Sequence, residues 1–304
     1  MYDLVIIGGG AAGLTAAIYA ARAGLDFVVL EQDGWGGGQI TSAHKVENYP
    51  GVPNINGAEL GEMIKEQAVS LGAKIELGIV ENIEDNGDYK EITLHSGDVV
   101  QSKTVIAATG ANPRKLNVTG EQALLGRGVS YCAVCDGAFF ADKDVFVIGG
   151  GDTAVEDTIY LSSICKSVTL VHRRDTFRAP QTRVDALLKL PNVTVRYKEI
   201  LSAITGGQRV DGVELKRADG CTHYDANGVF IAVGSVPATA YLKSLPLTFD
   251  NDYVVANEDC KTSVDGLFVA GDIRKKQLRQ VVTAVADGAN AAASAIEYLK
   301  EKLC

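Results

Sequence analysis

The chain has 304 residues, of which 46% are hydrophobic and 22% are charged, and its formal net charge at pH 7 is -9. This length predicts about two domains, each large enough to bury a core. The acidic balance argues against non-specific binding to nucleic acid or to an anionic membrane, and six cysteines are too sparse for a disulfide scaffold.

The N-terminus passes from Met1-Tyr2-Asp3 directly into an apolar run, without the basic segment and cleavage pattern of a secretion signal. Arg22 and Asp287 interrupt the longest apolar stretches, so no membrane-spanning helix is predicted. We therefore expect a cytoplasmic protein. In that compartment a close cysteine pair is more often catalytic or metal-binding than structural.

A predicted βαβ unit opens the chain. It comprises a strand over 4–7, a turn over 8–13, a helix over 14–23 that ends at Gly24, and a strand over 26–30. The turn, Gly8-Gly9-Gly10-Ala11-Ala12-Gly13, fits the dinucleotide-binding pattern G-x-G-x-x-G.

The glycines stand where such a turn needs them. Gly8 permits the tight turn, Gly10 lets the backbone approach a pyrophosphate, and Gly13 lets helix and strand pack closely. Glu31, at the end of the second strand, has about the spacing expected of the acid that binds ribose hydroxyls.

The unit recurs in the second half of the chain. The repeat comprises a strand over 145–148, a turn over 149–154, a helix over 155–164 and a strand over 168–171. Its turn, Gly149-Gly150-Gly151-Asp152-Thr153-Ala154, fits G-x-G-x-x-A. Where the first copy has Glu31 the second has His172, and arginines follow at Arg173, Arg174 and Arg178.

This difference in charge predicts different ligands for the two copies. A carboxylate accepts hydrogen bonds from free ribose hydroxyls and repels a 2′-phosphate, whereas a guanidinium cluster offers that phosphate charge and forked donors. We expect FAD or NAD in the first site and NADPH, in preference to NADH, in the second. His172 is interpreted as a binding-loop residue and not as a catalytic base.

Later segments indicate how the halves connect. Apolar strands over 105–110 and 229–234 end in glycine, and a third over 267–272 ends in Asp272, whose carboxylate can accept from a ribityl hydroxyl. We expect a helix within 54–72, short strands over 73–105 and a closing helix over 283–299. A crossing near 111–114 and a return within 235–246 predict an α/β fold with two Rossmann-like βαβ dinucleotide-binding domains, the second inserted into the first.

Cys132 and Cys135, with Asp136 immediately after, lie just ahead of the second glycine turn. Two thiols at this spacing can close a reversible disulfide, and an adjacent acid can supply or remove a proton. Beside two nucleotide sites, the pair predicts an electron relay. A zinc site is the alternative, for which Cys165 with His172 is the only nearby completing pair, and neither has motif spacing.

Other reactive or charged residues show no partner pattern. We expect ordinary thiols or surface histidines at Cys165, Cys221, Cys260, Cys304, His44, His95 and His223. Trp35 either covers a cofactor edge or packs in its loop, and Arg127 either contacts a protein substrate or lies exposed. The basic segment over 274–278 is expected to be a solvated surface run, with steering of an acidic partner as the alternative.

From end to end the chain resembles the low-molecular-weight, bacterial-type thioredoxin reductases. The shared motifs are both glycine turns, Gly38-Gln39, Val46-Glu47-Asn48-Tyr49-Pro50-Gly51, Ala108-Thr109-Gly110, Cys132-Ala133-Val134-Cys135-Asp136-Gly137, His172-Arg173-Arg174 with Arg178, Gly271-Asp272 and Arg279-Gln280. The resemblance implies a homodimer that uses FAD and NADPH to reduce thioredoxin, with the two domains rotating between half-reactions.

The same resemblance implies a role for each residue of the dithiol motif. Cys135 would face the flavin, Cys132 would attack the substrate disulfide, and Asp136 would transfer the proton. A flavin can accept a hydride and pass electrons to a disulfide, and the attacking thiolate would then exchange through a mixed disulfide.

The resemblance also implies domain boundaries and cofactor contacts, and no metal. The domains would be 1–112 and 244–304 for FAD, and 113–243 for NADPH with the dithiol. The FAD contacts would be Gly8, Gly10, Ala11, Ala12, Gly13, Glu31, Gly38, Gln39, Asn48, Val80, Thr109, Gly110, Gly271, Asp272, Arg279, Gln280 and Val281. The NADPH contacts would be Gly149, Gly151, Asp152, Thr153, Ala154, His172, Arg173, Arg174 and Arg178.

Other functions for these residues stay open. A related flavin disulfide reductase would use a peroxiredoxin-system protein or oxygen as acceptor, or ferredoxin as donor. Relatives of the ferredoxin kind lack the arginine cluster that this chain has. A non-catalytic redox sensor is the alternative outside enzymes, although sensing alone would not need an acid beside the cysteine pair.

Overall fold

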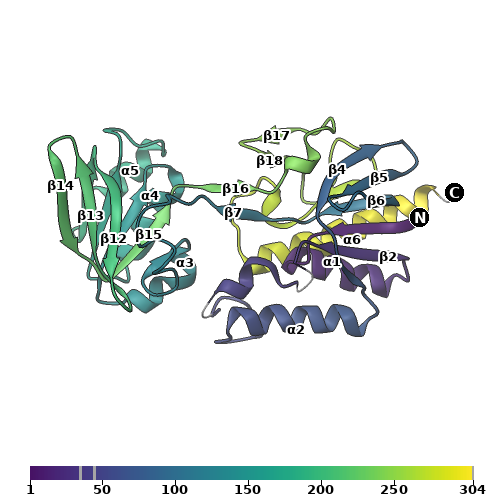
Figure 1. The fold of residues 1–304 in the computed structure, drawn as a ribbon, viewed down its shortest axis with the longest axis horizontal. Coiled ribbons are helices and arrows are strands. Elements are labelled where there is room, and N and C mark those ends of the chain that lie inside the picture. The colour runs from purple at the N-terminus through teal and green to yellow at the C-terminus, as the bar shows by residue number, and fades with distance from the viewer. Residues whose placement is uncertain (34–35, 44–45, 303–304) are drawn as a thin grey trace. The chain divides into compact units, whose positions relative to one another are not determined.

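The computed structural model describes residues 1–33, 36–43 and 46–302, so Trp35, His44 and Cys304 lie outside the described residues. The chain divides into two compact units, Met1–Asn112 with Val236–Cys304, and Pro113–Ser235 (Figure 1). Both units are α/β, and the second is inserted into the first, which confirms the predicted fold class.

The first unit is built on one large sheet with helices packed against it. Its main elements are β1 (Tyr2–Ile7), α1 (Ala11–Arg22), β2 (Phe27–Glu31), α2 (Gly57–Ser70), β3 (Ile75–Leu77), β4 (Val80–Asp85), β5 (Lys90–Leu94), β6 (Val99–Ala107), β19 (Leu267–Val269) and α6 (Val281–Lys302). Within the described residues the sheet has the order β3-β2-β1-β6-β5-β4, and β19 adds parallel to the end of β6.

Alternation along β1 places side chains in two apolar cores, one on each face of the sheet. Leu4 and Ile6 belong to the core shared with α1, α2 and α6, while Val5 and Ile7 belong to the opposite core. Small residues let α1 and α6 approach closely, because a Cβ on Gly288 of α6 would lie 2.1 Å from the Ala12 carbonyl oxygen.

Short elements complete the first unit. They are η1 (Gly38–Ser42), η3 (Ala240–Leu242), β17 (Phe249–Asp250), β18 (Tyr253–Val254) and η4 (Gly271–Ile273). Tyr241 and Leu242 of η3 are buried in the core of the first unit, so the chain returns at Val236 and not after residue 243 as expected. The two crossing segments, β7 (Ala111–Pro113) and β16 (Ser235–Pro237), pair with each other.

The second unit repeats the parallel arrangement and adds an antiparallel sheet. Its elements are β8 (Val129–Ser130), α3 (Ala133–Asp136), η2 (Gly137–Phe140), β9 (Asp144–Gly149), α4 (Asp152–Ser162), β10 (Ser167–His172), α5 (Gln181–Leu187), β11 (Val193–Tyr197), β12 (Ile200–Gly206), β13 (Val210–Arg217), β14 (Gly220–Asp225) and β15 (Gly228–Ala232). Across its described residues the parallel order is β11-β10-β9-β15-β8, with β12-β13-β14 antiparallel.

Both nucleotide-turn helices start earlier than the sequence pattern predicts. The expected helices over 14–23 and 155–164 begin at Ala11 and Asp152 instead. Gly10 and Gly151 are their N-caps, with extended backbone, so the last residues of each glycine turn already form the first helical turn. Among the helices that the structure describes, none is both long and apolar enough to cross a membrane.

Candidate nucleotide cradles and redox site

The first glycine turn joins the end of β1 to the N-terminus of α1. Gly8 has a φ of +104°, and a Cβ there would lie 2.5 Å from the Ala108 carbonyl oxygen. At Gly10 the nearest atom to a Cβ, on Gly38, would be 3.8 Å away. Gly10 thus leaves open backbone at a helix N-terminus, where the partial positive charge suits a pyrophosphate.

Glu31 ends β2 directly beside this turn. Its residue is 8% exposed, and its carboxylate accepts hydrogen bonds from the backbone N–H groups of Gly9 and Gln32. A Cβ on Gly9 would lie 2.9 Å from Glu31 Oε2, so the close approach needs glycine. The acid is therefore held at the strand end, where a nucleotide ribose would pass.

Two segments distant in sequence also reach the first turn. The N–H of Gly37 donates to the Gly9 carbonyl oxygen at 2.7 Å, and the adjacent Gln39 donates to the Ala111 carbonyl oxygen. Near the other end of the chain, a Cβ on Gly271 would lie 2.9 Å from the Ala12 Cβ. Two of the segments named by the family resemblance, Gly38-Gln39 and Gly271-Asp272, therefore reach the glycine turn.

The carboxylate of Asp272, the first residue after Gly271, forms an ion pair with Lys276. The Asp272 side chain is 30% exposed, yet Oδ1 is buried and has no hydrogen-bond partner among the described residues. Burial raises the pKa of this carboxyl, and Lys276 opposes the rise. The exposed part of this carboxylate can accept from a ribityl hydroxyl, so the first unit's residues fit FAD.

Other predicted FAD contacts have protein partners or lie apart. Asn48 donates to Gln280 Oε1 at 2.9 Å, which joins two predicted residues. The Thr109 hydroxyl donates to the Ala238 carbonyl oxygen at 2.8 Å. Val80 packs against the core on the other face of the sheet from α1. The guanidinium of Arg279 lies 4.0 Å from the centre of the Tyr253 ring, and Val281 is the first residue of α6.

The second glycine turn joins β9 to α4 in the same way. A Cβ on Gly149 would lie 2.3 Å from the Ala232 carbonyl oxygen and 2.6 Å from the Ala154 Cβ. A Cβ on Gly151 would meet nothing within 4 Å. The open space at this helix N-terminus fits the pyrophosphate of a second dinucleotide.

His172 is buried beneath the second turn and does not face solvent. The residue is 6% exposed, its ring stacks on Phe177 with centroids 5.2 Å apart, and Nε2 lies 2.9 Å from the Thr176 carbonyl oxygen. A Cβ on Gly150 would lie 1.9 Å from the ring. His172 therefore supports the turn from behind, as Glu31 does in the first unit.

The arginines lie beside the same turn. The Arg178 N–H donates to the Gly150 carbonyl oxygen at 2.9 Å, while Arg173 and Arg174 follow the end of β10. All three are exposed. Asp152, by contrast, is paired with Arg183 at 2.5 Å. The backbone at Arg178 therefore lies against the turn, and the side chains of all three arginines are exposed.

Cys132 and Cys135 form a disulfide at the start of the short helix α3. Their Cα atoms are 5.3 Å apart. Cys132 is the N-cap, and its Sγ accepts from the Cys135 N–H at 3.1 Å. Both cysteines and Asp136 are partly exposed. No group of three or more His, Cys, Asp or Glu suited to a metal ion occurs in the residues described.

Ser130 is a site residue that the sequence reading missed. It is 4% exposed, its hydroxyl donates to Asp136 Oδ2 at 2.6 Å, and its Oγ accepts from the Cys132 N–H at 3.0 Å. Ser130 therefore links the acid to the backbone of the first thiol. A lone serine before the motif carries no pattern from which this role could be predicted.

Tyr131, between Ser130 and Cys132, is anchored to a buried acid. Its hydroxyl donates to Glu121 Oε1 at 2.7 Å, and the Glu121 carboxylate also accepts from the N–H groups of Leu116 and Val118. Burial and the neighbouring Glu121 raise the pKa of Tyr131. The chain entering the dithiol is thus fixed at the two residues before Cys132.

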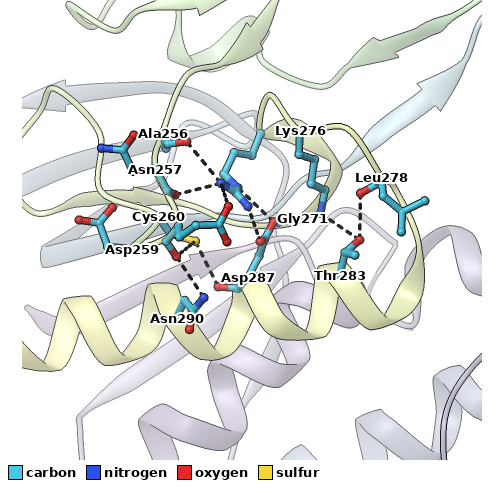
Figure 2. A network of polar contacts seen from close by, with 12 residues as sticks. Ala256, Asn257, Asp259, Cys260, Gly271, Lys276, Leu278, Thr283, Asp287 and Asn290 are labelled. Atoms are coloured by element: carbon cyan, nitrogen blue, oxygen red, sulfur yellow. Dashed lines mark hydrogen bonds and ion pairs between the residues drawn. The ribbon is translucent and has the colours of Figure 1, made fainter.

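The expectation that the segment over 274–278 is a solvated run is wrong for two of its residues. The side chains of Arg274 and Lys276 are 6% and 8% exposed, and both pair with Asp287 of α6 (Figure 2). Only the Lys275 ammonium reaches the surface, where it pairs with Asp250. In the sequence, Asp287 is distinguished only as an interruption of an apolar run.

The cysteines and histidines outside the site agree with their expected settings. Cys165 and Cys260 are buried thiols, and burial raises their pKa to about 11 and about 12. Cys221 is exposed. His95 and His223 are surface residues beside Glu81 and Asp225.

Comparisons with known proteins agree with this geometry. A family model described as pyridine nucleotide-disulphide oxidoreductase matches residues 2–288. Thioredoxin reductase of Listeria monocytogenes is 43% identical over 304 residues, which span 99% of this chain and 95% of that protein. The chain belongs to the pyridine nucleotide-disulphide oxidoreductase family and, within it, to the thioredoxin reductases.

Solved structures of thioredoxin reductases share the fold. That of Streptococcus pyogenes MGAS5005 is 43% identical and has a TM-score of 0.93, with 99% of each chain covered. A ferredoxin-flavin thioredoxin reductase from Clostridium acetobutylicum is 31% identical with a TM-score of 0.54, covering 99% of this chain and 98% of that one. Members of this family use flavin and a nicotinamide cofactor. These two classes of cofactor match the two glycine turns, one in each unit.

Proposed function

We propose that this chain is an NADPH-dependent thioredoxin-disulfide reductase, with FAD in the first unit and NADPH in the second. The observation that carries the proposal is the dithiol with its own acid, Cys132, Cys135 and Asp136, held by Ser130. The names and identities of the relatives support thioredoxin as the substrate. When bound, flavin supplies the conversion of a hydride into an electron pair that a disulfide can accept.

The dithiol residues then perform two thiol–disulfide exchanges. With the pair reduced, the Cys132 thiolate attacks one sulfur of the thioredoxin disulfide, forms a mixed disulfide and releases one thioredoxin thiolate. The Cys135 thiolate attacks Cys132 Sγ, re-forms the internal disulfide and releases the second. Asp136 exchanges the proton that keeps one thiol neutral between the two steps.

The arginine cluster supports NADPH as the electron source. Arg173, Arg174 and Arg178 are exposed beside the turn where the ribose phosphate would lie, and guanidinium groups suit a phosphate in charge and geometry. One of the similar solved structures is a ferredoxin-flavin thioredoxin reductase, so ferredoxin is the main alternative electron donor.

One anaerobic assay tests the proposal. Purified protein with FAD is mixed with NADPH, NADH or reduced ferredoxin, and the flavin spectrum and thiol release from a panel of thioredoxins are followed together. Multiple turnovers with NADPH and thioredoxin are expected. Turnover with ferredoxin alone would contradict it. So would turnover with a peroxiredoxin-system protein, or with oxygen in a parallel aerobic assay, but not with any thioredoxin.

Two variants connect the activity to the dithiol. Cys132→Ser and Cys135→Ser should keep flavin reduction by NADPH and lose thioredoxin turnover. Cys221→Ser, at an exposed thiol on β14, is the control that should leave both unchanged. Thioredoxin turnover retained in the Cys132 variant would mean that the pair is not the relay, and a signalling role without catalysis would require single-turnover behaviour.

We also propose that the protein is a cytoplasmic homodimer. The support is the family resemblance. Light scattering of the purified protein measures the mass directly, and a monomer at working concentrations would contradict the dimer.

A further inference from the structure

A cluster of buried charges lies between the loop that carries Asp272 and helix α6. Asp287, 3% exposed, accepts from Arg274 Nη2 at 2.7 Å, from Lys276 Nζ at 2.9 Å and from the backbone N–H of Gly271 at 3.0 Å (Figure 2). One helix carboxylate therefore holds two cations and the backbone of the loop.

Arg274 already balances Asp287. Its Nη1 also donates to the carbonyl oxygens of Ala256 and Asn257, at 3.3 and 2.9 Å, so its remaining donors are engaged by the chain. Arg274 alone would neutralise the charge of Asp287, so Lys276 is a second buried cation in the same cluster. Burying an ammonium is costly unless it meets a further anion.

That further anion is Asp272. Lys276 Nζ lies 3.6 Å from Asp272 Oδ1, the buried oxygen without a hydrogen-bond partner among the described residues. Lys276 approaches the carboxylate on its buried side, and the exposed part of the side chain is left for a ligand. Asp287, Lys276 and Asp272 thus form a chain of alternating charge from α6 to the cofactor loop.

We propose that Lys276 is a positioning residue for the flavin, which favours the ionised form of Asp272 and directs it toward the cofactor, and that Asp287 acts through Lys276 by holding its ammonium in place. This inference rests on the proposed binding of FAD in the first unit. Charged groups that face Asp272 are Lys276, Arg279 and Asp287, and the residue of α1 against this loop is the apolar Ala12. Lys276 lowers the pKa of Asp272 against the effect of burial.

The sign of the pH effect follows from these contacts. An ionised Asp272 accepts from a ribityl hydroxyl, whereas a protonated one loses much of that capacity. Without Lys276 the pKa of Asp272 rises further, so FAD affinity should begin to fall at a higher pH in the variant than in the wild type.

The experiment titrates flavin-free protein with FAD between pH 5 and 8 and follows flavin fluorescence. Lys276→Met should weaken FAD binding by about tenfold or more at the acidic end, with a smaller loss at pH 8. Lys276→Arg should restore the affinity and the pH profile, and Lys275→Met, one residue away at the surface, should match the wild type. Lys276→Gln replaces the methionine variant if that one does not fold.

A double-mutant cycle separates positioning from general stability. In an Asp272→Asn background, Lys276→Met should have little further effect on FAD affinity, because the partner through which Lys276 acts is already neutral. Equal affinity and pH profile for Lys276→Met and wild type would overturn the inference. A wild-type protein that does not bind FAD would instead contradict the proposed function.

Discussion

Ser130 and Asp136 share a hydrogen bond of 2.6 Å from the serine hydroxyl to Oδ2 of the carboxylate. The same hydroxyl oxygen accepts from the Cys132 N–H, so the acid and the first thiol are oriented by one buried side chain. The proposed proton transfer by Asp136 therefore depends on Ser130, although Ser130 does not itself transfer a proton in the reaction.

Ser130→Ala should slow thioredoxin turnover by about tenfold, because a hydrogen bond to a charged group contributes about 1.5–3 kcal/mol. The KM for NADPH should be unchanged. Ser130→Thr, which keeps the hydroxyl, should recover most of the rate. Steady-state turnover with thioredoxin and flavin reduction by NADPH are the two measurements, and full thioredoxin turnover in the alanine variant would remove Ser130 from the proton path.

Replacing Arg173 and Arg174 by glutamine should raise the KM for NADPH by about tenfold or more and leave that for NADH unchanged. The reason is that the guanidinium groups are expected to meet only the 2′-phosphate. Arg209→Gln, an exposed arginine in the turn between β12 and β13, is the control. Steady-state flavin reduction with each nucleotide makes the comparison, and equal losses for both nucleotides would contradict a phosphate site.

Gly151→Ala should bind NADPH about tenfold more weakly while folding as stably as the wild type. The added methyl meets nothing within 4 Å in the protein, and alanine in place of glycine restricts the unfolded chain. Any loss of affinity would then come from the space that the pyrophosphate needs. Gly207→Ala, also in open space, is the matched control. Urea unfolding and NADPH titration provide the two measurements, and undiminished affinity would contradict the pyrophosphate site.

Asp157 of α4 should make the second unit less stable above neutral pH. Burial, with a smaller effect from Glu156, raises the pKa of its carboxyl to about 7. The folded state therefore binds a proton that the unfolded state has lost, and stability falls as pH rises from about 4 to about 7. Asp157→Asn should flatten this fall and raise the free energy of unfolding at pH 8 by about 1–3 kcal/mol.

Urea unfolding at pH 4.5 and pH 8 tests the Asp157 prediction. The exposed Asp185→Asn, on α5 of the same unit, should leave the pH dependence as it is. If the Asp157→Asn variant had the same pH dependence of unfolding free energy as the wild type, the folded protein would stabilise the ionised carboxylate as well as the unfolded chain does.

The two glycine turns could be predicted from sequence because sterics leave few substitutes. A Cβ on Gly13 would lie 1.8 Å from the Gly8 carbonyl oxygen, and one on Gly149 would lie 2.3 Å from the Ala232 carbonyl oxygen. Such close approaches allow only glycine at fixed spacings, so the pattern indicates the geometry directly. The family resemblance extended the site to Gly38, Gln39 and Gly271, which no local pattern indicates.

The charged residues behind the cofactor loop could not be predicted in this way. Sequence reading treats Arg274 and Lys276 as surface residues, because charge is usually exposed. Their burial depends on Asp287, which α6 brings back to the loop from a later part of the chain. The return at Val236 was missed for a similar reason, since the burial of Tyr241 is decided by tertiary packing.

The discontinuity of the first unit has a consequence for the order in which the protein is made. Strand β19 pairs with β6, and α6 packs on α1, yet both leave the ribosome only after the whole inserted unit. The inserted unit is continuous and can fold as it emerges, while the N-terminal segment waits with the faces of β6 and α1 uncovered. A nascent chain stalled after the insertion should therefore expose apolar surface to chaperones, and a protein clipped before α6 should lose flavin before it loses nicotinamide.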